Sequence, residues 1–297
     1  MQSPITGNTS ATLVEEIPST IIIELYKKEL NMNVAHFFEN TASVQLFQCV
    51  ETGYRFFAPF SLAGDAPFYA DLQQKYKTYY RDWKWEYGFA ANVLTKEMNV
   101  LEIGCGRGTF LQHITGKVKT CVGLELNPKA IEIAQKAGLD VRNELIDAHA
   151  AAYPEKYDVV CFFQVLEHIN DIKGFIDGAL KTLKTGGKLI IGVPNSDPYL
   201  LKYDKFHTLN LPPHHAGLWN KATFQQLGNH FPMELQKVGY EPLRAIEQQL
   251  KMVLAHQKQN FMLSVAHLIP HFVYKGLGKL LGNLFEGTTI VTIFVKK

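Results

Sequence analysis

Three glycines at alternate positions follow a short apolar stretch that contains an acid. The run from Val100 to Ile103 reads as a buried strand, and Gly104, Gly106 and Gly108 come directly after it. The next residues, Thr109 to Ile114, have the apolar spacing of a helix. Glycine lets a ligand approach the main chain closely, and the start of a helix offers free N–H groups. The motif therefore predicts a site for a ligand that carries an anionic or carboxylate group.

A second acid, Glu125, ends the next apolar run, from Thr120 to Leu124. A carboxylate at the end of a second strand can accept hydrogen bonds from both hydroxyls of a ribose. Dinucleotides and S-adenosylmethionine both present such a ribose to a glycine turn. The dinucleotide fingerprint requires glycine or alanine three residues after its second glycine, and here that position is Thr109. The spacing therefore favours S-adenosylmethionine.

Polar residues follow another apolar run, from Tyr157 to Phe163. Gln164, Glu167 and His168 come directly after it. In open parallel sheets a ligand lies beyond the carboxyl ends of the strands, so we expect these side chains beside the reacting group. His168 is a candidate catalytic base because histidine exchanges protons near neutral pH. Glu167 either orients His168 or faces away as a helix-capping acid.

Two further histidines, His214 and His215, lie in a proline-containing aromatic loop from Leu209 to Trp219. This loop follows the expected strand from Lys188 to Val193, which places it at the same edge of the sheet. The pair can bind a substrate or accept its proton, and it is equally consistent with packing. We treat both residues as candidate catalytic groups after His168.

The apolar runs and helical patterns alternate from Asn99 onward. This alternation is typical of a parallel sheet with helices on both faces. Pro128 is well placed in the first turn of a helix that ends before Gly138, because proline is favoured at that position and glycine beyond the last turn. The expected architecture is therefore an α/β domain that holds all the candidate groups at one edge.

Together these motifs resemble those of class I S-adenosylmethionine-dependent methyltransferases. The resemblance is to enzymes that act on small molecules, including those that methylate sugars and quinones, and it covers about Asn99 to Asn195. It implies a doubly wound seven-stranded sheet, mostly parallel with an antiparallel last strand. The matching segments are Glu102-x-Gly104-x-Gly106-x-Gly108, Glu125-Leu126-Asn127, Val165-Leu166-Glu167-His168-Ile169 and Lys184-Thr185-Gly186-Gly187.

The resemblance also implies S-adenosyl-L-methionine as the cofactor. Asp147, with Ala148 beside it, would meet the adenine amino group or else cap the following helix. Aromatic faces suit a sulfonium cation, so Tyr80 and Trp85 are lid candidates within Ala66 to Thr95, although a packed helix pair explains the same aromatics. The expected cofactor contacts are Glu102, Gly104, Cys105, Gly106, Glu125, Leu126, Asp147, Ala148, Gln164 and Tyr80.

We expect no metal ion. Quinone O-methyltransferases of this type hold a metal with Glu-x-x-Glu-His, and Gln164 stands at the first of those positions. Related sugar-pathway enzymes carry an N-terminal zinc ribbon, of which this chain keeps Cys49 and Gly53 but has Thr52 in place of the second cysteine. One thiolate cannot make a closed tetrahedral site. The segment from Val44 to Phe57 is therefore expected to be a metal-free hairpin, a degenerate zinc ribbon.

The C-terminal part of the chain carries an excess of positive charge. From Ala245 to Lys297 there are six lysines and two glutamates, and Val273 to Leu281 resembles a basic amphipathic helix. Such helices either cap the substrate or contact an anionic membrane or a polysaccharide-assembly partner. The expected organisation is a flexible lead at 1–18, an N-terminal hairpin and helical lid at 19–95, a cofactor-binding core at 96–244, a helical insertion at 245–287 and a final strand at 288–297.

The composition sets further bounds. The chain has 297 residues, of which 46% are hydrophobic and 20% charged, and its net charge of +2 provides no basic stripe for a nucleic acid. No apolar run reaches the roughly 20 residues that span a bilayer, and a cytoplasmic location is expected. The four cysteines show no paired spacing and are expected to be reduced.

These observations predict an enzyme that methylates a small-molecule acceptor. A hydroxyl of a sugar or sugar-linked metabolite is the expected target. Carbon or nitrogen methylation of a related substrate, and a non-catalytic cofactor-binding scaffold in polysaccharide or lipid synthesis, are the alternatives.

Overall fold

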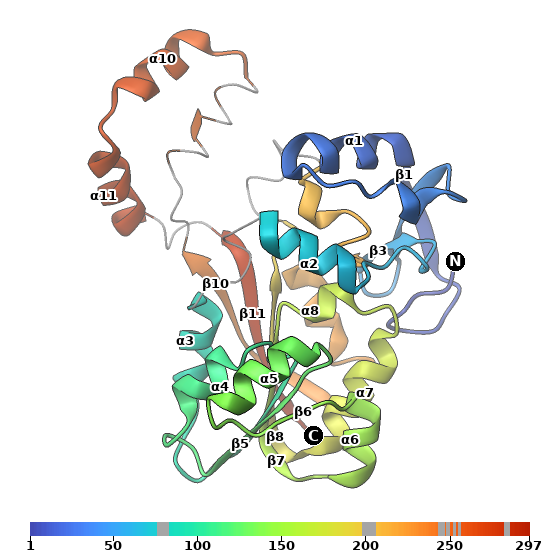
Figure 1. The fold of residues 1–297 in the computed structure, drawn as a ribbon, viewed down its shortest axis with the longest axis vertical. Helices are drawn as coiled ribbons and strands as arrows, with labels where there is room; N and C mark the ends of the chain where they lie inside the picture. The colour runs from blue at the N-terminus through green and yellow to red at the C-terminus, as the bar shows by residue number, and fades with distance from the viewer. Residues whose placement is uncertain are drawn as a thin grey trace.

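The computed structural model describes residues 1–75, 83–197, 206–242, 247, 250–251, 254, 257–281 and 286–297. Its centre is a seven-stranded sheet in the order β10-β11-β8-β7-β4-β5-β6 (Figure 1). The strands are β4 (Asn99–Ile103), β5 (Thr120–Leu124), β6 (Val141–Arg142), β7 (Tyr157–Phe163), β8 (Leu183–Pro194), β10 (Met233–Pro242) and β11 (Glu286–Lys296).

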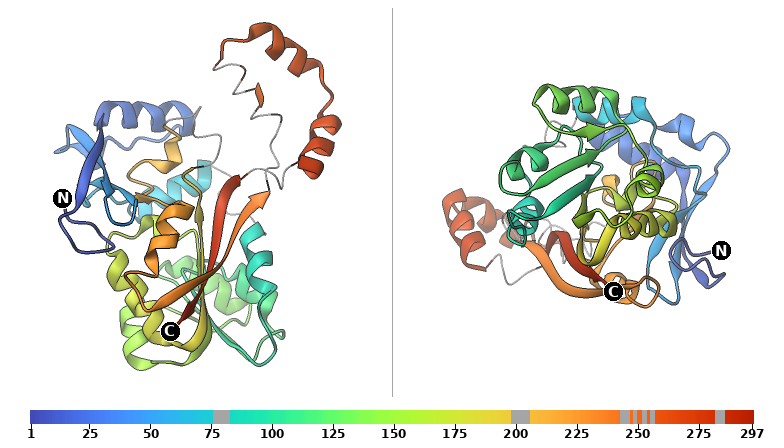
Figure 2. Two further views of the ribbon diagram at one scale, coloured as in Figure 1. Left: turned by 180° about the vertical axis from the view of Figure 1, so that it is seen from behind. Right: turned by 90° about the horizontal axis from the view of Figure 1, so that it is seen from below.

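The direction of the strands agrees with the expected fold. β4 pairs in parallel with β5 and β7, and β7 pairs in parallel with β8. β11 pairs antiparallel with both β8 and β10, and Figure 2 shows β10 and β11 running side by side. The prediction of a doubly wound sheet with an antiparallel last strand is confirmed.

Helices cover both faces of this sheet. Ile146 of α6, Ile176 of α7 and Phe224 of α8 belong to the buried cluster on one face. Ala90 of α3 and Phe110 of α4 belong to the cluster on the other, together with apolar residues of α5. The helices are α3 (Trp85–Ala91), α4 (Thr109–Ile114), α5 (Pro128–Lys136), α6 (Ile146–Ala152), α7 (Ile172–Thr182) and α8 (Lys221–Leu227), with the 3-10 turn η2 (Leu166–His168) after β7. The carboxyl ends of the parallel strands are thus left open between two layers of helices.

A second, four-stranded antiparallel sheet combines three strands that precede the core in sequence with β9, which follows β8. Its order is β1-β2-β3-β9, and it includes the expected hairpin, in which Gln48 pairs with Arg55 across the turn at Gly53. A third buried cluster packs one side of it with α1 and α2. The elements are β1 (Ala11–Pro18), α1 (Ser19–Leu30), η1 (Ala35–Phe38), β2 (Ser43–Cys49), β3 (Arg55–Ala58), α2 (Ala66–Lys75), η3 (Thr208–Asn210) and β9 (Gly217–Leu218).

The expectation of a flexible lead at 1–18 is wrong. β1 pairs antiparallel with β2, the Ile5 side chain is buried in the core, and the backbone N–H of Lys173 donates to the carbonyl oxygen of Pro4. β1 is an edge strand with mostly exposed side chains, so backbone pairing rather than an apolar pattern holds it in place.

Two helices of the C-terminal insertion, α10 (Asn260–Leu268) and α11 (His271–Leu281), stand apart from the sheet (Figures 1 and 2). Among the described residues, no helix is both long enough and apolar enough to cross a membrane.

Candidate functional site

A cavity of about 1790 Å³ opens at the carboxyl ends of β4, β5 and β7. The glycine loop, the end of β5 and the turn after β7 line it. So do α3 and the segment 211–216 between η3 and β9, called the histidine loop below because it carries His214 and His215. Ligands of open parallel sheets bind at this edge, because the loops that follow the strands converge there.

The glycine loop needs its glycines for different reasons. Gly104, Gly106 and Gly108 have φ values of 70°, 55° and 76°. A Cβ at Gly104 would lie 2.5 Å from Cγ2 of Val165, so this glycine lets the turn after β7 pack closely. A Cβ at Gly106 would meet no described atom within 4 Å, which leaves the main chain there open to the cavity.

Glu125 lies where the sequence predicts, at the end of β5. One of its carboxylate oxygens accepts a hydrogen bond of 2.8 Å from the N–H of Gly106. The other accepts from the N–H groups of Leu126 and Asn127. Leu126 lines the cavity with an exposed side chain, which offers an apolar surface next to the carboxylate.

Other expected cofactor residues lie elsewhere. Glu102 is buried behind the loop and does not line the cavity; burial raises its pKa to about 8, and its Oε2 has no hydrogen-bond partner within the described structure. Asp147 and Ala148 are also absent from the cavity wall. The third strand ends at Arg142, and Ile146 begins α6, so Asp147 lies in the first turn of that helix rather than at a strand end. Its carboxylate faces Gly178 of α7. Leu145, not Asp147, is the N-cap residue.

Cys105 and Tyr80 were also expected to contact the cofactor. Cys105 lines the cavity, but its thiol packs over Gly123, where a Cβ would lie 2.5 Å from Sγ. Burial raises the pKa of this thiol, so packing is its evident role. Tyr80 lies outside the described residues.

Gln164 reaches a partner that sequence reasoning missed. Its amide Nε2 donates to Oε1 of Glu86 at 3.2 Å, and both side chains line the cavity. Burial raises the pKa of Glu86, which lies on α3 next to the lid candidate Trp85. A lone acid in the aromatic run from Trp83 to Phe89 was the available signal, because an acid on an apolar face needs a partner.

The expected catalytic residues also meet in this cavity. Glu167, His168, His214 and His215 all line it. The ring centroids of His214 and His215 lie 4.4 Å apart, and those of His168 lie 4.8 Å and 5.1 Å from these two. Tyr69 of α2 adds a hydroxyl 3.3 Å from Nδ1 of His168.

Burial keeps these groups uncharged. It lowers the pKa of His168 to about 4 and that of His214 to about 3, and it lowers that of His215 well below its ordinary value. It raises the pKa of Glu167 to about 8. At neutral pH the three imidazoles are therefore neutral, and each carries a lone pair.

The N-terminal sheet holds the histidine loop in position. β9, directly after the loop, pairs with β3, and the hydroxyl of Tyr26 donates to the carbonyl oxygen of Leu211. The backbone N–H of Ala216 donates to the carbonyl oxygen of Glu167 at 2.8 Å, which joins the loop to η2. The N-terminal region thus positions His214 and His215, which lie more than 150 residues further along the chain.

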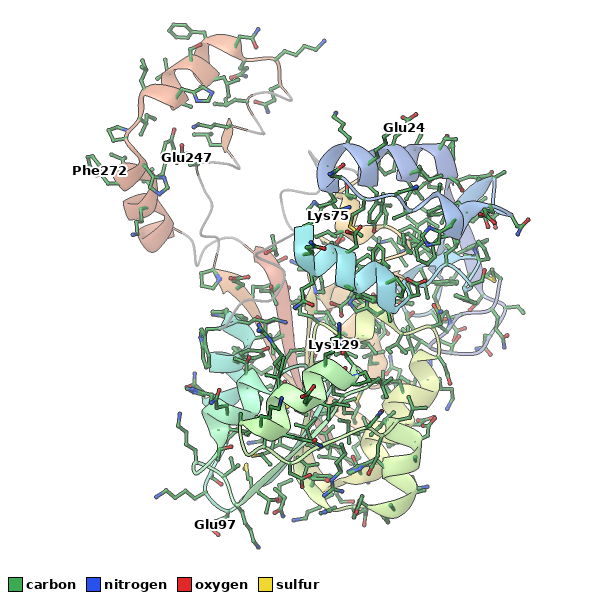
Figure 3. All side chains as sticks on the ribbon, in the orientation of Figure 1. Glu24, Lys75, Glu97, Lys129, Glu247 and Phe272 are labelled. Atoms are coloured by element: carbon green, nitrogen blue, oxygen red, sulfur yellow. The ribbon has the colours of Figure 1, made fainter. Side chains whose placement is uncertain are left out.

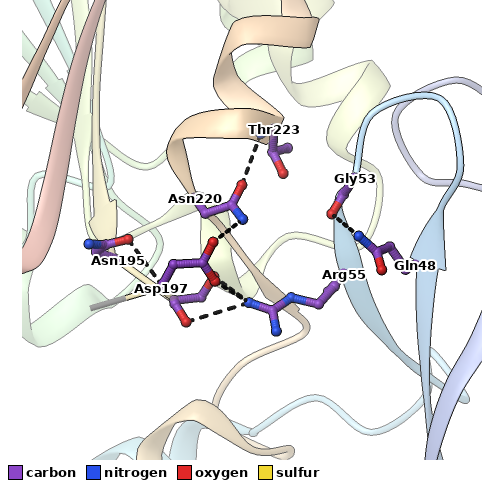
Figure 4. Close-up of polar contacts among 8 residues, drawn as sticks. Gln48, Gly53, Arg55, Asn195, Asp197, Asn220 and Thr223 are labelled. Carbon is purple, nitrogen blue, oxygen red and sulfur yellow. Dashed lines mark hydrogen bonds and ion pairs between the residues drawn. The ribbon is translucent and has the colours of Figure 1, made fainter. Parts of the chain in front are cut away.

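A polar network fixes the end of β8 next to this region (Figure 4). Arg55 of β3 donates to Oγ of Ser196 and pairs with Asp197 at 2.8 Å. Asp197 in turn accepts from Asn220, whose side chain caps α8 through the N–H of Thr223. These contacts connect the two sheets by side chains as well as by backbone.

The comparisons with known proteins agree with this geometry. The family described as "Methyltransferase domain" matches residues 73–251, more than half of the chain, and the chain belongs to that family. Membership implies S-adenosyl-L-methionine as the cofactor. The site fits this group, since an open main chain at Gly106 lies next to a carboxylate that is already oriented at Glu125.

Individual relatives are more distant. The chain is 33% identical over 110 residues to a ubiquinone biosynthesis O-methyltransferase of Thiobacillus denitrificans, covering 34% of this chain and 47% of the relative. It is 28% identical over 102 residues to the protein of that name from Klebsiella pneumoniae, covering 32% and 42%. The matches thus span less than half the length of these relatives. A SAM-dependent methyltransferase structure from Archaeoglobus fulgidus shares the fold, with a TM-score of 0.50, 16% identity and coverage of 77% of this chain and 100% of that chain.

Proposed function

We propose that the protein transfers the methyl group of S-adenosyl-L-methionine to a hydroxyl of a small molecule, with a sugar or sugar-linked metabolite as the best candidate. One observation carries this proposal: the glycine loop with Glu125 and the histidine cluster line the same cavity. A cofactor at the glycine loop and a polar acceptor at the histidine cluster would share one space.

Residues around the glycine loop bind and orient the donor. Glu125 would accept hydrogen bonds from ribose hydroxyls, Gly106 would admit the ligand against its main chain, and Leu126 would cover an apolar face of the adenosyl group. Trp85 lines the cavity and supplies an aromatic surface suited to a cation. When bound, the cofactor supplies an electrophilic methyl group on a sulfonium.

Residues of the histidine cluster bind the acceptor. Neutral imidazoles accept hydrogen bonds, so His168 and its neighbours can hold a hydroxyl in one orientation. A pKa of about 4 makes His168 a weak proton acceptor, so we expect it to position the acceptor hydroxyl rather than to take up its proton. Placing nucleophile, methyl group and leaving sulfur in line provides most of the catalysis in such a displacement.

Calorimetric titration with S-adenosylmethionine and S-adenosylhomocysteine tests the first half of this proposal, with NADH as the control ligand. We expect micromolar binding of both adenosyl ligands and none of NADH. Folded protein that binds neither adenosyl ligand would overturn the proposal, and binding of NADH instead would point to an oxidoreductase.

A product assay tests the second half. With labelled S-adenosylmethionine, we expect O-methylated products from sugars or sugar-linked hydroxyl compounds. Methylation of carbon or nitrogen, or turnover of phenols alone, would contradict the proposed acceptor while leaving the methyltransferase proposal intact.

We also propose that α10 and α11 contact an anionic lipid surface. Phe261, Leu268 and Phe272 are 81%, 81% and 74% exposed, and Figure 3 shows Phe272 pointing outward from α11. From 257 to 281 the sequence has three lysines and no aspartate or glutamate. Large exposed apolar side chains beside positive charge are typical of helices that lie in a membrane interface. In the described structure neither helix lines the cavity, which argues against a role as a substrate cap.

A further inference from the structure

Three histidines that line the cavity lie close enough to share a ligand. One ring nitrogen from each of His168, His214 and His215 lies within 4.8 Å of the other two. His168 comes from η2, and the other two come from the loop that η3 precedes. The hydrogen bond from Ala216 to Glu167 holds these two segments together. The cluster is therefore a product of the fold, because His168 lies 46 residues before His214 in sequence.

Backbone carbonyls fix the tautomers of two of these rings. Nδ1 of His168 lies 2.5 Å from the carbonyl oxygen of His214, and Nδ1 of His214 lies 2.8 Å from that of Leu209. A carbonyl oxygen only accepts, so in each neutral ring Nδ1 carries the proton and Nε2 carries the lone pair. Histidines that bind metals commonly donate their second N–H to a backbone carbonyl in this way.

Glu167 adds a carboxyl group next to the cluster. Its Oε1 lies 3.8 Å from Nε2 of His168, and its buried Oε2 has no hydrogen-bond partner in the part of the chain that the structure describes. A buried carboxyl oxygen without a partner is costly. A cation held by the three rings would lie close to this carboxylate and stabilise it.

We propose that His168, His214 and His215 together bind one divalent transition metal ion, with zinc as the best match and with Glu167 beside it. Neutral imidazoles suit zinc, and three histidine ligands with one open position are typical of catalytic zinc sites. Tetrahedral zinc with bonds of about 2.0 Å places its nitrogens about 3.3 Å apart. The three ring nitrogens lie at most 4.8 Å apart, so they would have to approach one another by no more than about 1.5 Å to reach this spacing.

All three histidines line the cavity, so an ion held by them would lie beside the acceptor hydroxyl. A hydroxyl bound to such an ion would have a lowered pKa, and the Glu167 carboxylate would take its proton, since the three imidazoles would hold the ion. This role in catalysis rests on the proposed function, whereas the binding of the metal does not. The expectation of no metal was based on Gln164 and on the incomplete zinc ribbon at Cys49. Gln164 donates to Glu86, and neither Gln164 nor Cys49 takes part in this cluster.

Metal titration of the untagged, chelator-treated full chain tests the proposal. We expect one Zn²⁺ ion to bind per chain by calorimetry, and Co²⁺ to give the visible absorption of a four- or five-coordinate site. The variants His168→Gln, His214→Gln and His215→Gln should each lose at least about 10-fold in Zn²⁺ affinity, since even outer-shell partners of metal sites cost that much. His36→Gln is the matched control, because His36 is exposed in the N-terminal part of the chain, and it should bind as the wild type does.

Two results would overturn the proposal. One is wild-type protein that binds neither ion, and the other is Zn²⁺ affinity that the three cluster substitutions leave unchanged. Binding of S-adenosylhomocysteine, measured on the same samples, shows whether each variant is folded and separates the two proposals. Protein that binds the adenosyl ligand but no metal keeps the proposed function and loses the metal site; the reverse result keeps only the metal site.

Discussion

The carboxylate of Glu125 accepts a hydrogen bond of 2.8 Å from the backbone N–H of Gly106 and so joins the turn after β5 to the glycine loop after β4. Its second oxygen accepts from Leu126 and Asn127. The orientation of the carboxylate is therefore set by main-chain donors before any ligand arrives. Such preorganisation lowers the cost of binding, because little has to be ordered afterwards.

Replacing this carboxylate should weaken cofactor binding. In Glu125→Gln one of the two oxygens becomes an amide that cannot accept, and the charge is lost. Hydrogen bonds to charged groups contribute about 1.5–3 kcal/mol, so we expect the Kd for S-adenosylhomocysteine to rise about 10-fold or more by calorimetry. Glu132→Gln is the control, since Glu132 lies on the exposed side of α5 and pairs only with Lys136 among the described ion pairs. Equal affinity of the two variants for S-adenosylhomocysteine would show that Glu125 does not bind the ligand.

The main chain at Gly106 can be tested against a second glycine of the same geometry. Gly106 and Gly116 have φ values of 55° and 77°, and a Cβ at either would meet no described atom within 4 Å. Alanine at each should lower the free energy of unfolding by about 1–2 kcal/mol, from the left-handed backbone alone. Only Gly106 lines the cavity, so only Gly106→Ala should also weaken adenosyl binding, by about 10-fold. A similar loss in Gly116→Ala would mean that general destabilisation explains both.

The sequence predicted the central sheet well because its strands are buried on both faces. β4 and β7 are apolar almost throughout, and β4, Asn99–Ile103, contains the expected run from Val100 to Ile103. β1 could not be predicted in the same way, since seven of its eight side chains are not buried and its place depends on pairing with β2. β6 has only two residues, so Asp147, which was expected to meet the adenine, lies beyond it in the first turn of α6.

The candidate site likewise combines residues that local patterns predicted with contacts that depend on the tertiary fold. Gly106, Glu125 and Gln164 follow directly from strand ends, so local patterns predicted their positions. The contact between His168 and His214 depends on how a loop folds back across the cavity, which no local pattern encodes. Glu86 was missed because its only signal was a single acid within an aromatic helix.

Burial of Glu102 should make the stability of the protein depend on pH. Its pKa is raised from 4.5 to about 8, so between these values the folded state holds a proton that the unfolded state has released. The free energy of unfolding then falls as pH rises through this window, by up to about 1.4 kcal/mol per pH unit for one such group. Glu102→Gln removes this contribution, and we expect its pH dependence from pH 5 to 8 to be flatter than that of the wild type in denaturant titrations.

The control for this prediction is Glu97→Gln, because the Glu97 side chain is exposed just before β4. It should reproduce the wild-type slope. A Glu102→Gln variant with the wild-type slope would show that Glu102 is ionised in the folded protein, and that the partnerless Oε2 is satisfied by water.

The exposed side chains of α10 and α11 should bind anionic vesicles. We expect the wild type to sediment with phosphatidylglycerol vesicles and far less with phosphatidylcholine vesicles, and added salt should weaken the binding because it screens the lysines. Burying one exposed Phe or Leu contributes about 1.5–3 kcal/mol, so replacing Phe261, Leu268 and Phe272 by serine should reduce binding at least 100-fold, to about background. Serine at Leu13 and Val14, which are half-exposed on β1, should have no effect. Undiminished sedimentation of the triple variant would place the lipid contact elsewhere, and equal binding to both kinds of vesicle would remove the role of charge.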